Sequence, residues 1–354
     1  MTAAALFGPL TLEPDTARRL ERAAVLVLAG GASGERDVSL DSGAQIARAL
    51  AQADGRGPAR VRLVEVERDG RWRVQGEALP AAEALRALAP VDAVLLALHG
   101  GAGEDGTLQG FLETAGVRHT GSGVGASALC MDKLATRALA RDLGIDVARG
   151  TCVLRADAEQ ASLEEPRAFG ESGWFVKPRS GGSSVDTYAV PADGDLAQAV
   201  RAVARSGDDV LVEEALVGVE CSCGVLERPG RGPLALPLVE IRPKPGRFFD
   251  YREKYSSDGA RELCPPEGIA PDVQERVAAA ALRLFRAVGC RGYARIDFVV
   301  EAGGRAVLLE ANTLPGLTAR SLLPQEAAAV GIDYRSLCLW ILAVALARDA
   351  EAAP

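Results

Sequence analysis

The stretch YARIDFVVEAGGRAVLLEAN, residues 293–312, determines most of what the sequence predicts about the fold. Two apolar runs flank Gly303-Gly304, and such a glycine pair favours a two-residue turn between antiparallel strands. If the turn is tight, the strands pair outward from it, and Asp297 lies directly opposite Glu310. The sequence therefore predicts a β-hairpin that brings two acidic side chains together.

The polar residues of this hairpin are expected to share one face. The same register places Arg295 opposite Asn312, and side chains alternate between the two faces of a strand, so both join the two acids. The other face is apolar and is expected to form a core, with Ile296, Phe298 and Val300 facing Ala311, Leu309 and Val307.

Two facing carboxylates need compensation, because like charges directly opposite each other, with Cβ atoms about 4.5–5.5 Å apart, are destabilising. A hard divalent cation supplies it if Asp297, Glu310 and the amide oxygen of Asn312 hold the ion and phosphate oxygens complete its shell. The alternative is a surface hairpin whose acids are solvated or paired with Arg295. The following segment ANTLPGLT (311–318) predicts a sharp backbone turn beside the proposed metal.

Other residues stand where they could meet a nucleotide. Lys133 opens a predicted helix, and Lys177 ends a predicted strand before the Gly/Ser loop 180–184. Such a loop can turn backbone N–H groups toward phosphate, while lysines add point charge. Glu213, Glu214 and Glu220 could accept hydrogen bonds from an adenine amino group and ribose hydroxyls. The alternatives are solvated surface residues and a plain flexible turn.

The N-terminal part alternates predicted strands and helices, which is typical of a parallel sheet. The apolar runs AAVLVLAG (23–30) and VDAVLLAL (91–98) each end at glycines. Ligands bind at the carboxyl ends of such strands. The Gly-rich loops 30–37 and 99–106 are therefore expected together at that edge.

Composition narrows the class of protein. The chain has 354 residues and a formal net charge of −8, which argues against a general nucleic-acid or anionic-membrane surface. Its seven cysteines follow no disulfide or zinc pattern and fit a reducing cytoplasm. No apolar run reaches the roughly 20 residues that span a bilayer, and the N-terminus does not resemble a signal peptide. We therefore expect a cytoplasmic protein.

We expect four segments along the chain. They are a variable extension (1–22), an α/β substrate-binding domain (23–121), a central domain (122–215) and a C-terminal catalytic domain (216–354). Within the last, the polar and aromatic stretch 247–266 has no periodicity, and a structureless stretch of that length is usually functional.

Seven segments, in this order, resemble the D-alanine–D-alanine ligase family: GGASGERDVSL, ALHGGAGEDGTLQG, TGSGVGASALCMDK, FVKPRSGGSSV, FFDYREKY, GYARIDF and LLEANTLPGLT. The resemblance runs from about residue 23 to 345. It implies an α/β ATP-grasp fold, in which a parallel α/β domain precedes two α+β domains that sandwich ATP. It also implies a homodimer and a role in making peptidoglycan precursors.

The resemblance implies a reaction and assigns residues to it. The carboxylate of one D-alanine attacks the γ-phosphate of ATP, and the amine of a second D-alanine attacks the resulting acyl phosphate. Two magnesium ions, or manganese in their place, match Asp297, Glu310 and Asn312. The phosphate contacts match Lys133, Lys177 and Lys254, and the adenine and ribose contacts match Glu213, Leu216 and Glu220.

The same resemblance assigns the substrate contacts. Glu35 matches the residue that receives the first ammonium group, while Arg295 and the backbone N–H of Gly316 match the pair that stabilises the oxyanion. The remaining matches order the loop over the site (Ser183, Tyr255) and hold the second carboxylate (Ser321, Leu322). His99 lies near the substrates, with a backbone-bonded loop histidine as the alternative. A closed loop would protect the acyl phosphate from water.

Three positions depart from the family pattern. Asp186 follows Val185 where a glycine is usual, Ala215 replaces a frequent aromatic residue near adenine, and Leu314 replaces a common serine. Lys254-Tyr255 fits the dipeptide-forming members, so we expect D-alanine as the second substrate. The alternatives are D-serine or D-lactate in that place, another ATP-grasp carboxylate–amine ligase, and a nucleotide-binding relative without catalysis.

Overall fold

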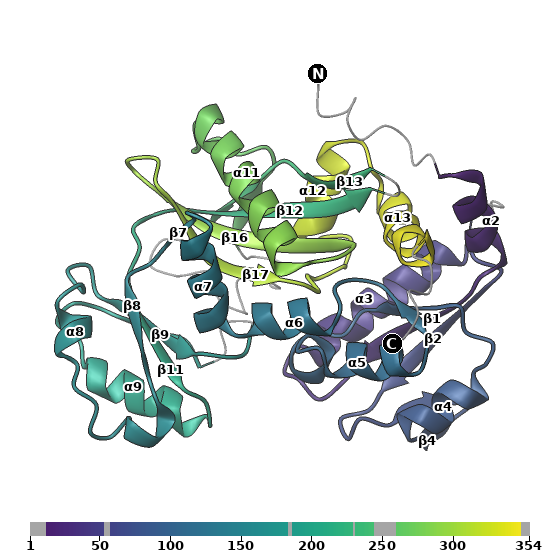
Figure 1. The fold of residues 1–354 in the computed structure, drawn as a ribbon, viewed down its shortest axis with the longest axis horizontal. Coiled ribbons are helices and arrows are strands. Elements are labelled where there is room, and N and C mark those ends of the chain that lie inside the picture. Colours follow the sequence, from purple (N-terminus) through teal and green to yellow (C-terminus); the bar gives the residue numbers. More distant parts are fainter. Residues whose placement is uncertain (1–11, 53–56, 183–185, 229–230, 244–259, 348–354) are drawn as a thin grey trace.

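The structure is a computed structural model that describes residues 12–52, 57–182, 186–228, 231–243 and 260–347. Three β-sheets organise these residues (Figure 1). The N-terminal sheet and the small four-stranded sheet lie at opposite ends of the long axis, and the largest sheet spans the space above them. The expected α/β class is confirmed by this mixture of sheets and helices.

The N-terminal sheet is parallel at its centre, as predicted. Its buried strands β1 and β5 are apolar throughout, which suits strands covered by helices on both faces. Four strands run parallel, and two short antiparallel strands extend one edge. The spatial order is β4 (Glu77–Leu79), β3 (Trp72–Val74), β2 (Arg60–Val66), β1 (Ala24–Gly30), β5 (Ala93–Leu96) and β6 (Arg118–His119). The helices of this part are α3 (Arg36–Leu50), α4 (Ala81–Ala87) and α5 (Thr107–Thr114), with a short 3-10 turn η1 (Gly101–Gly103).

The two Gly-rich loops meet at the carboxyl edge, as expected. The hydroxyl of Ser33 donates to the carbonyl of His99 at 2.5 Å, which ties one loop to the other. Gly30 ends β1 with a φ of 105°, and a Cβ there would lie 2.4 Å from the carbonyl oxygen of Val66. Glycine is therefore required where the first loop leaves the sheet.

The small sheet is antiparallel and has its own core. Its spatial order is β10 (Tyr188–Val190), β9 (Trp174–Pro178), β11 (Val210–Glu214) and β8 (Gly150–Val153). Its helices are α8 (Glu164–Arg167) and α9 (Leu196–Arg205), with a 3-10 turn η2 (Arg155–Asp157). Side chains such as Trp174, Val176 and Val200 fill the space between the sheet and these helices.

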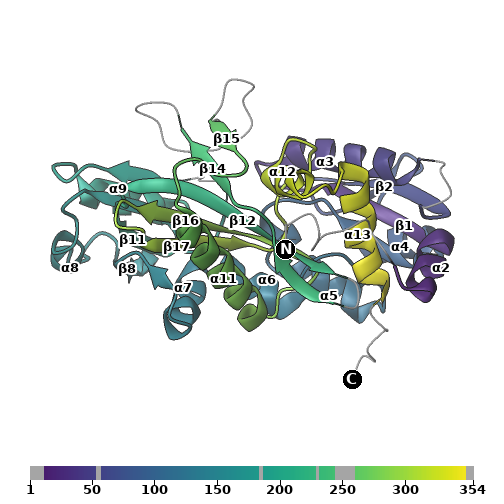
Figure 2. The same ribbon diagram turned by 90° about the horizontal axis from the view of Figure 1, so that it is seen from above.

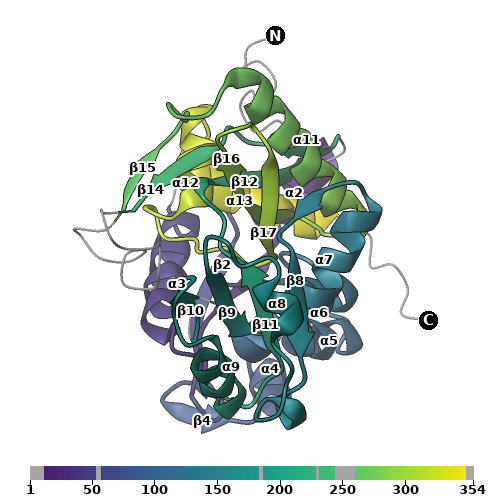
Figure 3. The same cartoon turned by 90° about the vertical axis from the view of Figure 1, so that its left-hand side faces the viewer.

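The largest sheet carries the hairpin. Its spatial order is β15 (Arg261–Leu263), β14 (Val239–Arg242), β12 (Gly218–Arg228), β16 (Tyr293–Glu301), β17 (Ala306–Asn312) and β7 (Asp146–Val147), with β13 (Gly232–Ala235) paired to β12. Figure 2 shows β14 and β15 at one edge of this sheet. The contacting helices are α6 (Val124–Met131), α7 (Lys133–Asp142), α11 (Pro271–Val288), α12 (Leu322–Ala329) and α13 (Tyr334–Ala347). Of these, α6 and α7 contact β17 (Figure 3).

The two faces of this sheet are covered differently. On one face, Cys221, Cys223 and Val225 of β12 pack with α11 in one core. On the other face, Leu226 joins Leu323 of α12 and the N-terminal sheet in a second core. The helices α12 and α13 therefore link the C-terminal residues to the N-terminal part.

The expected segments differ from the sheets in several places. The strand β7 belongs to the largest sheet, although it lies within the expected central segment (122–215). The helix α2 (Pro14–Arg22) lies within the expected extension and packs against α13. In the stretch 247–266, which was expected to be structureless, the described end forms β15. The domain boundaries themselves stay a prediction.

The predicted register around the acids is confirmed, but the turn was predicted wrongly. Asp297 pairs with Glu310, and Arg295 pairs with Asn312. The N–H of Glu301, however, donates to the carbonyl of Arg305 at 2.9 Å, which leaves a three-residue turn. A one-residue shift in the ladder beyond Asp297 offsets the longer turn.

This shift changes the apolar face. Phe298 lies opposite Leu308 instead of Leu309, and Val300 lies opposite Ala306 instead of Val307. Leu308 enters the core with Phe298. Leu309 is only partly buried. The expected core pairing was therefore correct only next to the acids, where Ile296 faces Ala311.

No single helix in the described ranges is long and apolar enough to cross a membrane. The helices α12 and α13 meet that criterion only as a pair, bent by 103° at their break and judged on length and composition alone.

Candidate active site

The polar face of the hairpin gathers the predicted metal residues. Asp297 is 6% exposed, and the Arg295 guanidinium contacts it at 2.8 Å (Nη2 to Oδ2) and 3.0 Å (Nε to Oδ1). Ser222 on β12 donates its hydroxyl to Asp297 at 2.7 Å. The amide of Asn312 donates to Glu310 at 3.3 Å. The four residues therefore lie together, as the sequence predicted.

Each acid of the pair has a nearby cation. Arg295 compensates Asp297, and the Nζ of Lys133 lies 3.8 Å from the Oε2 of Glu310. The pairing of Arg295 with an acid, which the sequence left open as an alternative to metal, is thus present. No group of three or more His, Cys, Asp and Glu side chains within the described ranges is arranged to hold a metal ion. An ion here would rely on two carboxylates, an amide and ligands from outside the chain.

Lys133 lies against the Gly/Ser loop. It begins α7, where Asp132 caps the helix by accepting from the N–H groups of Leu134 and Ala135. Its backbone N–H donates to the carbonyl of Arg179 at 3.0 Å, and its ammonium donates to the carbonyl of Gly181. The helix start and the loop are therefore held together at the point where the sequence predicted phosphate contacts.

Lys177 and Glu213 form a buried cluster with a residue that the sequence analysis missed. The Nζ of Lys177 lies 2.6 Å from the Oε2 of Glu213, and Arg137 pairs with the other carboxylate oxygen. Arg137 is 2% exposed and also donates to the carbonyl of Ala148 at 2.6 Å. Its position one helical turn after Lys133 was the available signal, since residues four apart share a helix face. The expected adenine contact of Glu213 stays a prediction, because both its oxygens hold cations here.

The cluster carries one positive charge in excess when Lys177 is protonated. Three cations, Lys133, Lys177 and Arg137, surround two carboxylates, Glu213 and Glu310. Burial, and next the charge of Lys133, lower the pKa of Lys177 to about 7, against the opposing charge of Glu310. Burial likewise lowers the pKa of Arg137 to about 10. An anion placed here would favour the charged form of Lys177.

The residues expected around adenine lie at the junction of two sheets. Leu216 is half-buried between β11 and β12. Glu220 lies on β12 opposite Val299 and two residues before Ser222, so it shares the face of the acids. The neighbouring Glu214 pairs with Arg149 at 2.6 Å instead and points elsewhere.

Glu35 and His99 lie at the carboxyl edge of the N-terminal sheet. Glu35 immediately precedes α3, and a Cβ on Gly100 would lie 3.6 Å from its Oε2. His99 is 5% exposed, and its Nδ1 lies 3.7 Å from Glu104 Oε1. Its Nε2 finds no hydrogen-bond partner among the residues the structure covers. The ring of His99 therefore faces an acid, and no backbone group of the described residues bonds to it.

The turn after β17 leads to the expected contacts of the second substrate. Gly316 is half-buried between Pro315 and the buried Leu317. Ser321 stands at the N-cap position of α12 without a capping hydrogen bond, and its hydroxyl lies 2.9 Å from that of Thr318. Leu322 is buried against Val239 and Ile241. Ser183, Lys254 and Tyr255 lie outside the described residues, so their expected roles stay predictions.

Comparison with known proteins agrees with these features. The chain matches the D-ala D-ala ligase C-terminus family over residues 139–343 and the corresponding N-terminus family over residues 73–122. It is 41% identical to the D-alanine–D-alanine ligase of Oleidesulfovibrio alaskensis over 91% of this chain and 96% of that one. The chain belongs to the D-alanine–D-alanine ligase family.

Solved structures of the family confirm the ATP-grasp fold that the resemblance implied. The VanG D-Ala:D-Ser ligase of Enterococcus faecalis has a TM-score of 0.78 and 28% identity, covering 92% of this chain and 99% of that one. The D-alanine–D-alanine ligase of Bacillus anthracis complexed with ATP has a TM-score of 0.73 and 30% identity, covering 92% and 97%.

The three departures from the family pattern have visible structural settings. Asp186 adopts a φ of 54°, a left-handed conformation that glycine adopts most easily and that Asp tolerates. Leu314 is buried in the core, where a Cβ added to Gly121 would lie 2.9 Å from its side chain. Ala215 is half-buried, and its N–H donates to the carbonyl of Gly173 at 3.0 Å.

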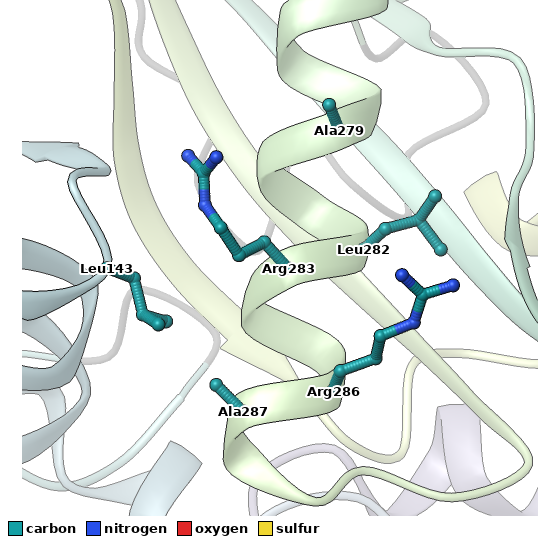
Figure 4. Close-up of a pocket in the computed structure, with 6 residues that line it drawn as sticks. All are labelled: Leu143, Ala279, Leu282, Arg283, Arg286 and Ala287. Carbon is teal, nitrogen blue, oxygen red and sulfur yellow. The ribbon is translucent and has the colours of Figure 1, made fainter.

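One pocket of about 500 Å³ lies away from this family site (Figure 4). It is formed between the end of α7 and the outer side of α11, and none of the predicted site residues lines it. Its lining residues are Leu143, Ala279, Leu282, Arg283, Arg286 and Ala287.

Proposed function

We propose that this protein joins two D-alanines into D-alanyl-D-alanine at the expense of ATP, releasing ADP and phosphate, as a cytoplasmic step of peptidoglycan precursor synthesis. Family membership and near full-length relatives of that name support this proposal. The observation that carries it is the excess cationic charge around Lys177, next to two paired acids on one sheet face.

The chain's own residues fit magnesium. Asp297 and Glu310 lie opposite each other with the Asn312 amide beside them, which are the hard oxygen donors that magnesium prefers. Magnesium ions bound there would neutralise charge on the phosphates of ATP. The small donor set suits a metal that shares its shell with phosphate oxygens and water.

The cationic cluster would hold the nucleotide. Lys133 and Lys177 would place their charges on the phosphates, aided by Lys254. Glu213 pairs with both Arg137 and Lys177. Because its single negative charge is shared with Arg137, it would not neutralise Lys177 completely. The half-buried Leu216 would cover the adenine ring, with Glu220 toward the ribose.

The reacting groups would meet between the two Gly-rich loops and the hairpin. Glu35 would receive the ammonium group of the first D-alanine, and the start of α12 at Ser321 and Leu322 would receive the carboxylate of the second. Arg295 and the N–H of Gly316 would stabilise the oxyanion that forms when the second amine attacks. His99 would border the first substrate, and Ser183 and Tyr255 would order the loop that excludes water.

The direct test is mass spectrometry of the products formed from ATP, magnesium and a mixture of D-alanine, D-serine and D-lactate. We expect D-alanyl-D-alanine, and we expect phosphate release with D-alanine as the only acceptor. Turnover with another acid but none with D-alanine would reject the proposal. ATP binding without turnover over the whole panel would indicate a non-catalytic relative.

We also propose that the protein acts as a homodimer, on the basis of the family resemblance alone. Light scattering coupled to gel filtration should give twice the 36.9 kDa mass of the chain. A monomer that is fully active would contradict this.

A further inference from the structure

Glu326 is a buried acid to which the proposed reaction assigns no role. It lies on α12 and is 0% exposed. Within the described parts of the chain neither of its carboxyl oxygens makes a hydrogen bond of good geometry, although the Gly224 backbone lies close enough to favour its charged form. Leaving a polar group buried without a partner is costly, so such a residue is unusual in a core helix. Burial raises the pKa of Glu326 well above its usual value, although the charge of Arg295 opposes this.

A glycine on the sheet makes the room for this carboxyl group. A Cβ added to Gly224 would lie 2.1 Å from the Oε2 of Glu326. Gly224 is the direct partner of Arg295 in the pairing of β12 with β16. The carboxyl group therefore occupies the space above the residue that adjoins Arg295 on the neighbouring strand.

Arg295 thus has acidic groups on three elements, because its charge also acts on Glu262 of β15, in addition to Asp297 and Glu326. Asp297, on its own strand, contacts it at 2.8 Å. Glu326, from the helix that covers this face, fills the space over Gly224. A second ionised acid beside Arg295 would cancel more of the charge that the proposed reaction uses, whereas an uncharged carboxyl group fills the space and leaves the charge available.

We propose that Glu326 is a positioning residue for Arg295: an uncharged carboxyl group over Gly224 that gives the guanidinium a polar neighbour and restricts its position without neutralising it. This inference rests on the proposed function, because it assumes that Arg295 stabilises the oxyanion. It assigns to α12 a second task besides holding the carboxylate of the second substrate.

The test compares two replacements of similar size. Glu326→Gln keeps an uncharged polar group in the same space, so kcat should stay within about threefold of the wild type. Glu326→Leu fills the space with apolar atoms, so kcat should fall about tenfold or more, a fraction of the loss expected for removing an oxyanion donor outright. The KM for ATP should stay within about threefold in both, because Lys133 and Lys177 are untouched.

Stability separates positioning from a merely structural role. Replacing an unpartnered buried acid with leucine should leave the thermal midpoint unchanged or raise it. A structural residue would show the opposite pattern, with lower stability and unchanged kcat. Glu301→Gln is the matched control: it removes an acid from the same strand as Arg295, at the outer end where Glu301 pairs with Arg305, and should leave kcat unchanged.

A double variant tests the placement itself. Gly224→Ala should lower kcat strongly in the wild-type background, because its Cβ would lie 2.1 Å from the Oε2 of Glu326 and 2.6 Å from the Cδ1 of Leu323, and the end of the leucine side chain can shift more easily than the buried carboxyl group. In the Glu326→Ala background the same change should cost several-fold less. Additive effects, a wild-type kcat for Glu326→Leu, or equal losses for Gln and Leu would each overturn the inference. Failure of the wild type to form the dipeptide would instead reject the proposed function.

Discussion

The low pKa of Lys177 predicts that ATP binding takes up a proton. Burial and the charge of Lys133 lower the pKa of this lysine from 10.5 to about 7. A pKa near 7 implies that about 90% of the lysines are neutral at pH 8 and about 10% at pH 6. Phosphates favour the ammonium form of Lys177. Binding of one ATP should therefore be accompanied by the uptake of close to one proton from the buffer at pH 8 and about a tenth of a proton at pH 6.

The affinity for ATP should follow the same equilibrium. Above pH 7, each further pH unit should weaken ATP binding by up to about tenfold, until the pKa of Lys177 in the complex is reached. The effect on the stability of the free protein has the same sign as for an acid whose pKa is lowered by folding. Between pH 7 and 10.5 the unfolded chain holds more protons at this lysine, so its contribution to stability rises with pH across that window.

Isothermal titration calorimetry in two buffers of different ionisation enthalpy measures this proton uptake directly. The measurement is made at pH 8, where the terminal phosphate, with a pKa near about 6, is already ionised. Lys177→Met should abolish the uptake and weaken ATP binding. Equal binding heats in the two buffers for the wild type, or unchanged uptake in Lys177→Met, would refute the reasoning.

Three further changes test other parts of the site. Arg295→Lys should lower kcat by about 10²-fold or more in steady-state assays, with little change in the KM for ATP, because lysine lacks the two parallel N–H donors of a guanidinium. A wild-type kcat would contradict the oxyanion role. Arg137→Leu should lower the free energy of unfolding in urea by about 2–4 kcal/mol, since Glu213 and the carbonyl of Ala148 each lose a buried partner, whereas the exposed Arg141→Leu on the same helix should change it by about 0.5 or less. Gly30→Ala should lower the free energy of unfolding by about 2 kcal/mol or more, because Gly30 has a φ of 105° and its added Cβ would lie 2.4 Å from the carbonyl oxygen of Val66. Gly34→Ala should not lower it, because no atom lies within 4 Å of the Cβ that it adds.

The sequence predicted the elements that depend on local pattern. The apolar runs at 23–30 and 91–98 became the buried parallel strands β1 and β5, because continuous apolar strands need cover on both faces. The alternating hairpin placed Asp297 and Glu310 together for the same local reason. The glycines between β16 and β17 predicted the existence of the turn but not its length, which depends on where the ladder shifts.

The contacts of Glu213 and Glu326 could not be predicted from the sequence pattern around each residue. An acid at a strand end usually faces water, and only the packing of α7 on the neighbouring sheets brings Arg137 to Glu213. In the same way, the helical pattern of α12 gives no sign that Glu326 is buried, because the space for it is made by Gly224 on a distant strand. Long-range packing, which a single sequence does not display, decided both.

The charge balance of the site explains why the facing acids are retained. Each of Asp297 and Glu310 has one nearby cation, and the wider cluster around Lys177 adds a single positive charge in excess when this lysine is protonated. A triphosphate carries several negative charges, more than that excess can balance in a partly buried place. Divalent cations drawn from solution would supply the difference, and the two acids would give them a fixed position on the chain. Replacing both acids by Asn and Gln would remove that fixed position, so that magnesium no longer tightens ATP binding, which a titration of ATP with and without magnesium would show.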